Sequence, residues 1–227
     1  MQQLPLSVRL RERASFECFH AGANLQVVTR LREIAAGARV VLWLWGSVAS
    51  GRSHLLQAVC AAAEGYRAAY LPLAEIGAAS SRFLEGAGLL DILCVDDFEL
   101  QLGDAAFEQA MFSAYRNLEE RNGGLVIAAG QPPTALNWSL ADIRSRLSAA
   151  EVFQLKPLDE AGELAALRLR ASARGLDLPE ETARYLLRRL PRDMNALGRW
   201  LDDIDLAALS AQRRLTVPFV KTILGEL

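Results

Sequence analysis

One stretch of this chain has the residue types and spacing that phosphate binding needs. Gly46 and Gly51 bound a short loop, and Arg52 and Ser53 follow it. Glycines let such a loop curl tightly with its N–H groups inward, and a helix that begins after it adds the positive end of its dipole. The apolar run of residues 40–45 and the helical pattern from His54 onward supply the strand, loop and helix that a phosphate loop requires. The stretch predicts a cradle for an anion such as a nucleotide diphosphate.

The loop departs from the usual pattern at one position, where Arg52 replaces the expected lysine. Arginine keeps the positive charge but is planar and bulky, so it cannot act as a compact point charge between the terminal phosphates. We interpret the loop as one that still holds a nucleotide, with weakened turnover. The alternative is an ordinary glycine- and serine-rich turn between a strand and a helix.

A second group of residues lies where metal-assisted phosphate chemistry would need it. The apolar run from Leu89 ends in Asp96 and Asp97. A carboxylate at the carboxyl end of a buried strand beside a phosphate loop can hold Mg²⁺, directly or through water. The second acid can orient an attacking water. The alternative is a pair of carboxylates that cap the next helix.

Composition limits the classes of protein to consider. The chain has 227 residues, of which 52% are hydrophobic and 23% charged, as in folded proteins. The net charge of −2 argues against a chain that mainly grips nucleic-acid phosphates. Three cysteines with no paired spacing argue against a disulfide framework. No apolar run reaches the length of a membrane span and no secretory signal is visible, so we expect a cytoplasmic protein with no membrane partner.

The order of elements predicts an α/β domain followed by a helical one. Strands are expected at residues 40–45, 66–71, 89–97, 125–129 and 152–155, and helices at 25–36, 53–64, 72–84, 104–121 and 140–147. Four further helices are expected at 159–174, 179–190, 192–211 and 217–227, and Asp159 is expected to cap the first of them. We divide the chain into a tail (1–14), a nucleotide-binding base domain (15–157) and a helical lid domain (158–227).

The segments that flank this core carry further expectations. Exposed apolar residues in the tail are either disordered or a peptide that docks into a partner. Phe16 and Phe19 cover a nucleotide base or simply pack, and Asn24 is expected to cap the next helix. The fourth strand ends in small residues, so the polar side chain that often senses the terminal phosphate is absent unless Gln131 reaches in. Arg192, at the start of a lid helix, opposes the helix dipole and is a candidate phosphate contact or a surface residue.

Together these features resemble the AAA+ ATPases, and more closely the Hda family of DnaA-related regulators of replication initiation. The resemblance rests on the loop segment GRSHLLQA, on residues 156–181 and 210–224, and on the arginine of Ser145-Arg146-Leu147. It implies an AAA+ P-loop core with a parallel five-stranded sheet, followed by a small all-α lid. The N-terminal Gln3, Leu4, Pro5 and Leu6 are similar to the family's clamp-binding peptide, in a compressed form.

The resemblance also implies roles for single residues. ADP (or ATP) with Mg²⁺ would be held by Gly46, Ser50, Gly51, Arg52, Ser53, His54, Asp96 and Arg192, with Ser53 and Asp96 at the metal. Asp97 would be catalytic, and Arg146 would be an arginine finger that acts in trans on ATP held by DnaA. The partners implied are DnaA and the DNA polymerase sliding clamp, with DNA contacted only through the clamp; a homo-oligomer stays open.

Three other functions are compatible with parts of the sequence. A free-standing ATPase is disfavoured by Arg52 and by the absent fourth-strand sensor. A DNA-binding initiator is disfavoured by the acidic net charge and by the end of the chain at Leu227. A helicase loader or scaffold of the same fold would not need the peptide Gln3–Leu6, so clamp binding separates it from the regulator.

Overall fold

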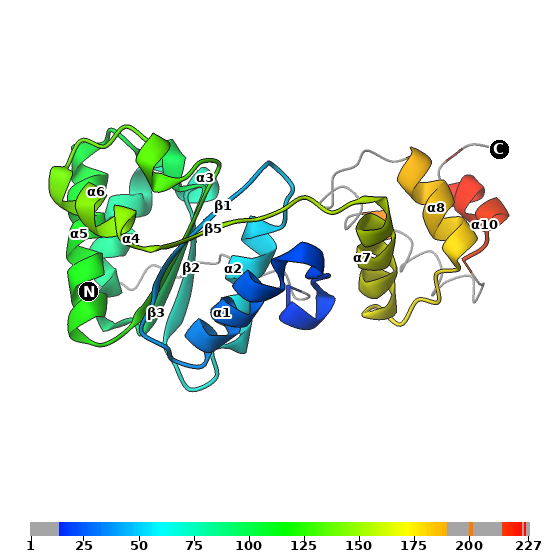
Figure 1. Ribbon diagram of the computed structural model, residues 1–227, viewed down its shortest axis with the longest axis horizontal. Coiled ribbons are helices and arrows are strands. Elements are labelled where there is room, and N and C mark those ends of the chain that lie inside the picture. Colours follow the sequence, from blue (N-terminus) through cyan, green and yellow to red (C-terminus); the bar gives the residue numbers. More distant parts are fainter. Residues whose placement is uncertain (1–13, 190–199, 202–214, 224, 226–227) are drawn as a thin grey trace. The chain divides into compact units, whose positions relative to one another are not determined.

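The protein is described by a computed structural model that covers residues 14–189, 200–201, 215–223 and 225. These residues form two compact units. The first contains residues 14–16 and 24–156, and the second contains 17–23 together with the described residues from 157 onward (Figure 1). Within the described residues, none of the helices has the length and apolar character that crossing a membrane demands.

The first unit is built on a parallel five-stranded sheet in the order β2-β3-β4-β1-β5. Its strands are β1 (Val41–Trp45), β2 (Ala68–Pro72), β3 (Ile92–Asp96), β4 (Gly124–Ala129) and β5 (Glu151–Gln154). The first strand, β1, lies between β4 and β5, with Leu44 opposite Ala128 and Phe153. Because all strands are parallel, the loops after β1, β3 and β4 meet at one edge of the sheet. This confirms the predicted α/β fold with a parallel sheet.

Helices cover both faces of the sheet (Figure 1). The helices of this unit are α1 (Leu25–Ala35), α2 (Arg52–Ala62), α3 (Leu73–Ile76), α4 (Ser80–Gly86), α5 (Ala105–Glu120) and α6 (Ala141–Ser148). On the face with α5 and α6, a core that includes Trp43, Val95, Phe107 and Ile127 excludes water. Burial of so many large apolar side chains stabilises the framework that carries the loops.

Three local predictions differ from the structure. Asn24 was expected to cap α1, but its side chain makes no cap bond and instead pairs with the backbone N–H and carbonyl of Lys156. Pro72 ends β2 rather than beginning a helix. The helix expected at 72–84 is divided into α3 and α4, since Gly77 after α3 has a φ of +55°. A glycine in the left-handed region ends a helix at little steric cost.

The second unit is helical in the residues that the structure describes. It contains α7 (Glu160–Ser172), α8 (Glu180–Arg189) and α10 (Val217–Ile223). Asp159 caps α7 by accepting a hydrogen bond from the Gly162 N–H at 2.7 Å, as predicted. Leu167, Leu186 and Val220 are fully buried in its core. Most of the helix expected at 192–211 lies outside the described residues.

Candidate phosphate-binding site and arginine helix

The loop between β1 and α2 has the backbone that the two glycines predict. A Cβ atom on Gly46 would lie 3.0 Å from the Ser50 hydroxyl oxygen and 3.2 Å from the Leu155 carbonyl oxygen, so only glycine fits. Gly51, directly before α2, has a φ of +100°, and Ala49 also has a positive φ. The chain therefore curls tightly into the first turn of α2, the geometry in which backbone N–H groups can face an anion.

Arg52 begins α2, and its side chain is only 11% exposed. Its Nη2 lies 3.9 Å from Asp97 Oδ1, and its Nη1 lies 4.0 Å from Glu99 Oε1. Both separations are too long for hydrogen bonds. The guanidinium is thus held near two carboxylates without being hydrogen-bonded to either.

Unpaired polar atoms gather at this loop. Four buried side-chain polar atoms make no hydrogen bond among the described residues, and three of them belong to Ser50 (Oγ), Arg52 (Nη1) and Glu99 (Oε2). Buried polar groups are normally paired, because an unpaired one costs about 1–3 kcal/mol. These atoms fit a site completed by a phosphate-bearing ligand.

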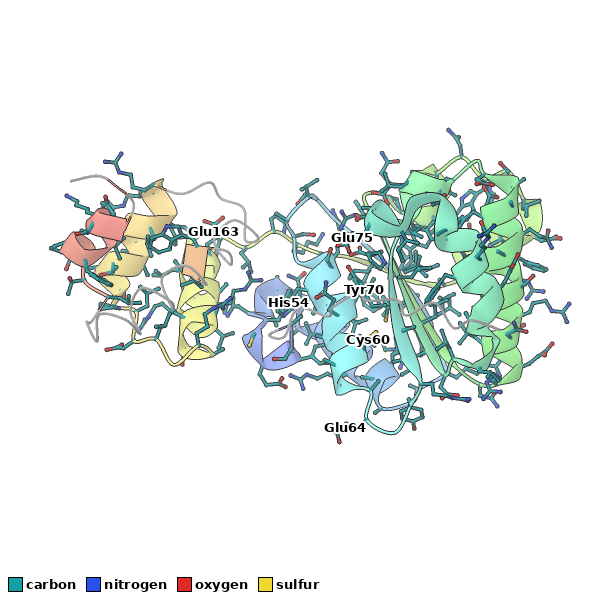
Figure 2. The ribbon with its side chains drawn as sticks, turned by 180° about the vertical axis from the view of Figure 1, so that it is seen from behind. His54, Cys60, Glu64, Tyr70, Glu75 and Glu163 are labelled. Atoms are coloured by element: carbon teal, nitrogen blue, oxygen red, sulfur yellow. The ribbon has the colours of Figure 1, made fainter. Side chains whose placement is uncertain are left out.

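The two predicted acids lie at the end of β3 and have different surroundings. Asp96 is 1% exposed, and it accepts hydrogen bonds from the Tyr70 hydroxyl at 2.7 Å and from the Asp97 N–H at 3.0 Å. Burial, and then the charge of Asp96, raises the pKa of Tyr70, so this phenol stays a donor (Tyr70 is labelled in Figure 2). Burial, and then Asp96, also raises the pKa of Asp97, while Arg52 opposes the shift. Hydrogen bonds thus fix the position of the Asp96 carboxylate, whereas the surroundings of Asp97 disfavour its ionised form.

Glu99 is a site residue that the sequence reasoning missed. It lies three positions after Asp96, in the 3-10 turn Phe98–Gln101, and its Oε1 accepts a hydrogen bond from the Gly130 N–H at 2.9 Å. This bond joins the ends of β3 and β4. In the sequence, Glu99 is only a third acid close after Asp96 and Asp97, and no motif singles out its position.

The end of β4 carries no polar side chain toward the loop, as the sequence predicts. Ala128 and Ala129 are buried, and Gly130 offers its backbone N–H to Glu99. Gln131 is exposed. Its backbone carbonyl accepts a hydrogen bond from the Trp43 indole N–H at 3.0 Å. The place of a sensor side chain is therefore taken by a contact between a carboxylate and the backbone.

Ser53 and His54 follow Arg52 in the first turn of α2. Ser53 is exposed. His54 is half-buried, and its Nε2 lies 2.8 Å from the Ser15 carbonyl oxygen, so the ring fastens the N-terminal segment to α2 (Figure 2). A nucleotide contact of His54 stays a prediction. In the same segment Phe16 is buried and Arg32 lies over its ring at 4.7 Å, which favours packing for this side chain.

Arg146 lies on α6, and its side chain is 40% exposed. The guanidinium carbon lies 5.5 Å from the centre of the Phe112 ring and 5.4 Å from that of Tyr115. Nη1 lies 3.5 Å from Glu119 Oε2, at the surface of α5. Cation–π contacts of this kind order an arginine without burying its charge. Arg146 is thus presented at the surface in a restrained position.

A buried carboxylate fixes the start of α6. Glu108, on α5, is fully buried and accepts hydrogen bonds from the backbone N–H groups of Gly103, Ser139 and Leu140 at 2.7–3.0 Å. Charged acceptors make strong bonds to backbone donors, and the loss of this one would leave three N–H groups unpaired. No motif indicates this role, because it depends on contacts with residues 31 and 32 positions away.

Other predicted site residues lie outside the described part of the chain. These are Arg192 in the lid and the tail residues Gln3, Leu4, Pro5 and Leu6. Their roles stay predictions.

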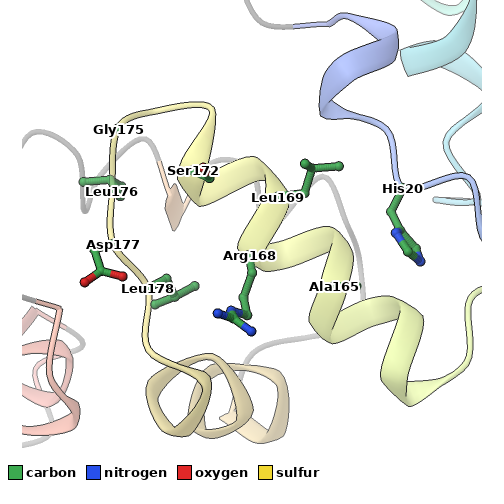
Figure 3. A pocket seen from close by; sticks show the side chains of 9 residues that line it. All are labelled: His20, Ala165, Arg168, Leu169, Ser172, Gly175, Leu176, Asp177 and Leu178. Carbon is green, nitrogen blue, oxygen red and sulfur yellow. The ribbon is translucent and has the colours of Figure 1, made fainter.

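The second unit contains a hollow of about 680 Å³ (Figure 3). His20 lines it, together with residues of α7 and of the loop that follows, among them Arg168 and Asp177. None of the residues that line it was a predicted site residue.

Comparison with known proteins agrees with this architecture. Residues 159–224 match the family model for the Hda lid domain. The structure is similar to domain III of the replication initiation protein DnaA from Thermotoga maritima, with a TM-score of 0.78, 20% identity, and coverage of 96% of this chain and 98% of that one. AMPPCP-bound DnaA from Aquifex aeolicus gives a TM-score of 0.68 at 21% identity, over 88% of this chain and 67% of that one.

The similarity in fold extends to a DNA-processing motor. Thermotoga maritima RuvB gives a TM-score of 0.64 at 13% identity, over 94% of this chain and 74% of that one. At these identities the solved structures establish the fold, and the family model adds a match to the Hda lid domain. The chain therefore has the fold of DnaA domain III, and its residues 159–224 are similar to the Hda lid domain.

Proposed function

We propose that this protein is a nucleotide-binding regulator of replication initiation that promotes hydrolysis of ATP bound to DnaA. The Hda lid at residues 159–224 is the observation that carries the proposal. This match supports a relation to Hda in addition to the fold that the chain shares with DnaA and RuvB. The regulator would bind DnaA and the sliding clamp, and DNA only through the clamp.

The phosphate loop supports nucleotide binding as one half of this function. Gly46 and Gly51 shape the loop, and the unpaired Ser50 Oγ and Arg52 Nη1 are free to meet phosphate oxygens. ADP or ATP would occupy this cradle, with Mg²⁺ held by Ser53 and Asp96; AMPPCP bound to the DnaA of similar fold is in keeping with this. When bound, the metal would neutralise phosphate charge.

Arg146 supports the other half, an action on a partner's nucleotide. Its charge is exposed, its position is restrained by two aromatic rings, and its helix is fastened by Glu108. A guanidinium presented in this way can offset the charge that develops during phosphoryl transfer on a neighbouring protein. Arginines supplied in trans accelerate such reactions by roughly 10³–10⁵-fold in other systems. The weak contact with Glu119 at 3.5 Å is easily exchanged for such a partner.

The N-terminal residues Gln3–Leu6 would bring the protein to its target. Leu4 and Leu6 would dock into an apolar pocket of the DNA-loaded clamp, so that DnaA is met where replication has begun. Hydrolysis would convert DnaA to its ADP form and prevent a second initiation.

The test is the conversion of DnaA-bound ATP to ADP in the presence of clamp-loaded DNA. We expect wild type to accelerate hydrolysis, and Arg146→Ala and the double variant Leu4→Ala/Leu6→Ala to fail while they remain folded. Arg144→Ala is the matched control, since Arg144 is an exposed arginine on the same helix. It should leave the acceleration within about twofold, as surface substitutions usually do.

Two results would contradict the proposal. If wild type leaves the hydrolysis rate of DnaA unchanged, a helicase loader or scaffold of the same fold becomes the better interpretation. If Arg144→Ala fails as fully as Arg146→Ala, the effect is one of charge on α6 and not of a single finger.

A further inference from the structure

The carboxylate of Glu99 has no part in the function proposed above, yet it lies beside the cation of the phosphate loop. We propose that Glu99 makes the site prefer a nucleoside diphosphate over a triphosphate, by placing a fixed negative charge at the end of the Arg52 side chain. The inference rests on the proposed nucleotide site and adds to it a residue that sets its selectivity.

The position of Glu99 is fixed by the fold. Its Oε1 accepts the hydrogen bond from the Gly130 N–H at 2.9 Å, which holds the carboxylate between the ends of β3 and β4. A Cβ atom on Gly130 would lie 3.0 Å from the same oxygen, so a side chain there would displace it. Gly130 thus provides both the donor and the space that Glu99 needs.

The same carboxylate faces the loop. Oε1 lies 4.0 Å from Arg52 Nη1, and Oε2 is buried with no hydrogen bond. The cation at this loop position is the group that reaches the β- and γ-phosphates of a bound nucleotide. The end of the Arg52 side chain therefore marks the region in which a third phosphate adds its charge, and Glu99 is already there.

The balance of charge at this edge disfavours a further anion. Among the described residues, Asp97 and Glu99 lie 3.9 and 4.0 Å from the Arg52 guanidinium, and Asp96 lies beside Asp97. Like charges this close repel, and a difference of about 1.4 kcal/mol in binding free energy already gives a tenfold selectivity. A diphosphate ends before this region and meets less of the repulsion.

Glu99 is singled out among the three acids by its hydrogen bonds. Both oxygens of Asp96 are engaged, by Tyr70 and by the Asp97 N–H. The Asp97 and Glu99 side chains are about equally exposed, at 33% and 32%, but Glu99 also accepts the hydrogen bond from the Gly130 N–H. Glu99 alone combines a fixed position with a buried, unpaired oxygen. The substitution Glu99→Gln removes its charge and keeps its size and an acceptor for the Gly130 N–H.

The experiment compares the dissociation constants of ADP and of the non-hydrolysed triphosphate AMPPCP by calorimetry, with and without Mg²⁺. We expect wild type to bind ADP more tightly by about tenfold or more, and Glu99→Gln to lose most of this preference. Glu99→Asp, which keeps the charge, should retain it. The control Glu64→Gln removes an exposed carboxylate just beyond the C-terminal end of α2, the end away from the phosphate loop, and it should leave the ratio unchanged (Glu64 is labelled in Figure 2).

Different results would overturn different statements. If Glu99→Gln strengthens the binding of both nucleotides equally, Glu99 only restrains Arg52 and does not discriminate. If Glu64→Gln shifts the ratio as much, the selectivity comes from net charge and not from Glu99. If wild type binds neither nucleotide, the proposed nucleotide site fails and this inference with it. Matching thermal unfolding of the variants and wild type separates all of these from misfolding.

Discussion

The two ends of β3 carry the same kinds of charge in opposite arrangements. Before its first residue, Asp91 accepts hydrogen bonds from the backbone N–H and guanidinium of Arg67 at 2.9–3.0 Å. After its last residue, Asp97 and Glu99 stand 3.9 and 4.0 Å from Arg52, beyond hydrogen-bonding distance. At one end the arginine and the carboxylate are hydrogen-bonded to each other, and at the other end the arginine stands apart from its carboxylates.

The pKa values record the same difference. Hydrogen bonds from Arg67 hold the pKa of Asp91 well below its usual range. Burial and the neighbouring Asp96 raise the pKa of Asp97. An acid that is stabilised as an anion serves the fold, whereas an acid that is destabilised as an anion marks a place where something else can bind. The end of β3 that carries the loop charges is therefore the one to test for a ligand.

The largest expected effect is the loss of nucleotide affinity when the arginine beside the loop, Arg52, is removed. We expect Arg52→Ala to weaken ADP binding by about 100-fold, because a buried guanidinium makes charge-assisted bonds worth roughly 2–3 kcal/mol to an anion. Arg67→Ala, at the opposite end of the strand, should leave the affinity unchanged. Calorimetric titration of both variants measures this, and an equal loss in the two would remove the distinction between the ends.

A smaller effect on stability should come from Asp91. We expect Asp91→Asn to lower the free energy of unfolding at pH 7 by about 1 kcal/mol, because the partly exposed pair with Arg67 loses its charge. A lowered folded pKa means that the stabilisation is present above the unfolded value, about 4, and is lost as the pH falls below it. Urea unfolding at pH 7 and at pH 3 measures it. A difference from wild type that does not shrink in acid would show that the charge of Asp91 is not responsible.

The β1–α2 loop and the acids at the end of β3 are predicted well from the sequence, because both depend on residues that are close together in the chain. Gly51 has a positive φ that glycine adopts without strain, and a Cβ atom on Gly46 would crowd Ser50 and Leu155. Asp96 and Asp97 stand at the end of an apolar strand. The parallel sheet then brings these loops together by topology alone. The same local reasoning predicts the cap of α7 by Asp159 correctly.

The rest could not be predicted, because it depends on partners far along the chain. Asn24 has a residue type that caps helices, yet its side chain joins Lys156, 132 residues away. Glu99 and Glu108 look like ordinary acids until the fold brings Gly130 and the start of α6 to them. Long-range hydrogen bonds leave no spacing in the sequence, so residues that work through them are invisible to motifs.

The smallest effect should come from Asp97, and its sign should be opposite to that of Asp91. A raised folded pKa means that the folded protein holds the proton more tightly than the unfolded one. The favourable contribution is then complete below the unfolded value of about 4, and it is lost as the pH rises through the folded pKa. At pH 7 the ionised Asp97 destabilises the fold.

We therefore expect Asp97→Asn to raise the free energy of unfolding at pH 7 by about 0.5 kcal/mol, a small amount because Asp97 is a third exposed. The gain over wild type should shrink as the pH falls toward 4, where wild type becomes protonated. Urea unfolding of the two proteins at several pH values measures the gain. A loss of stability at pH 7 would mean that Arg52 already holds Asp97 as Arg67 holds Asp91, and the two ends of β3 would then be alike.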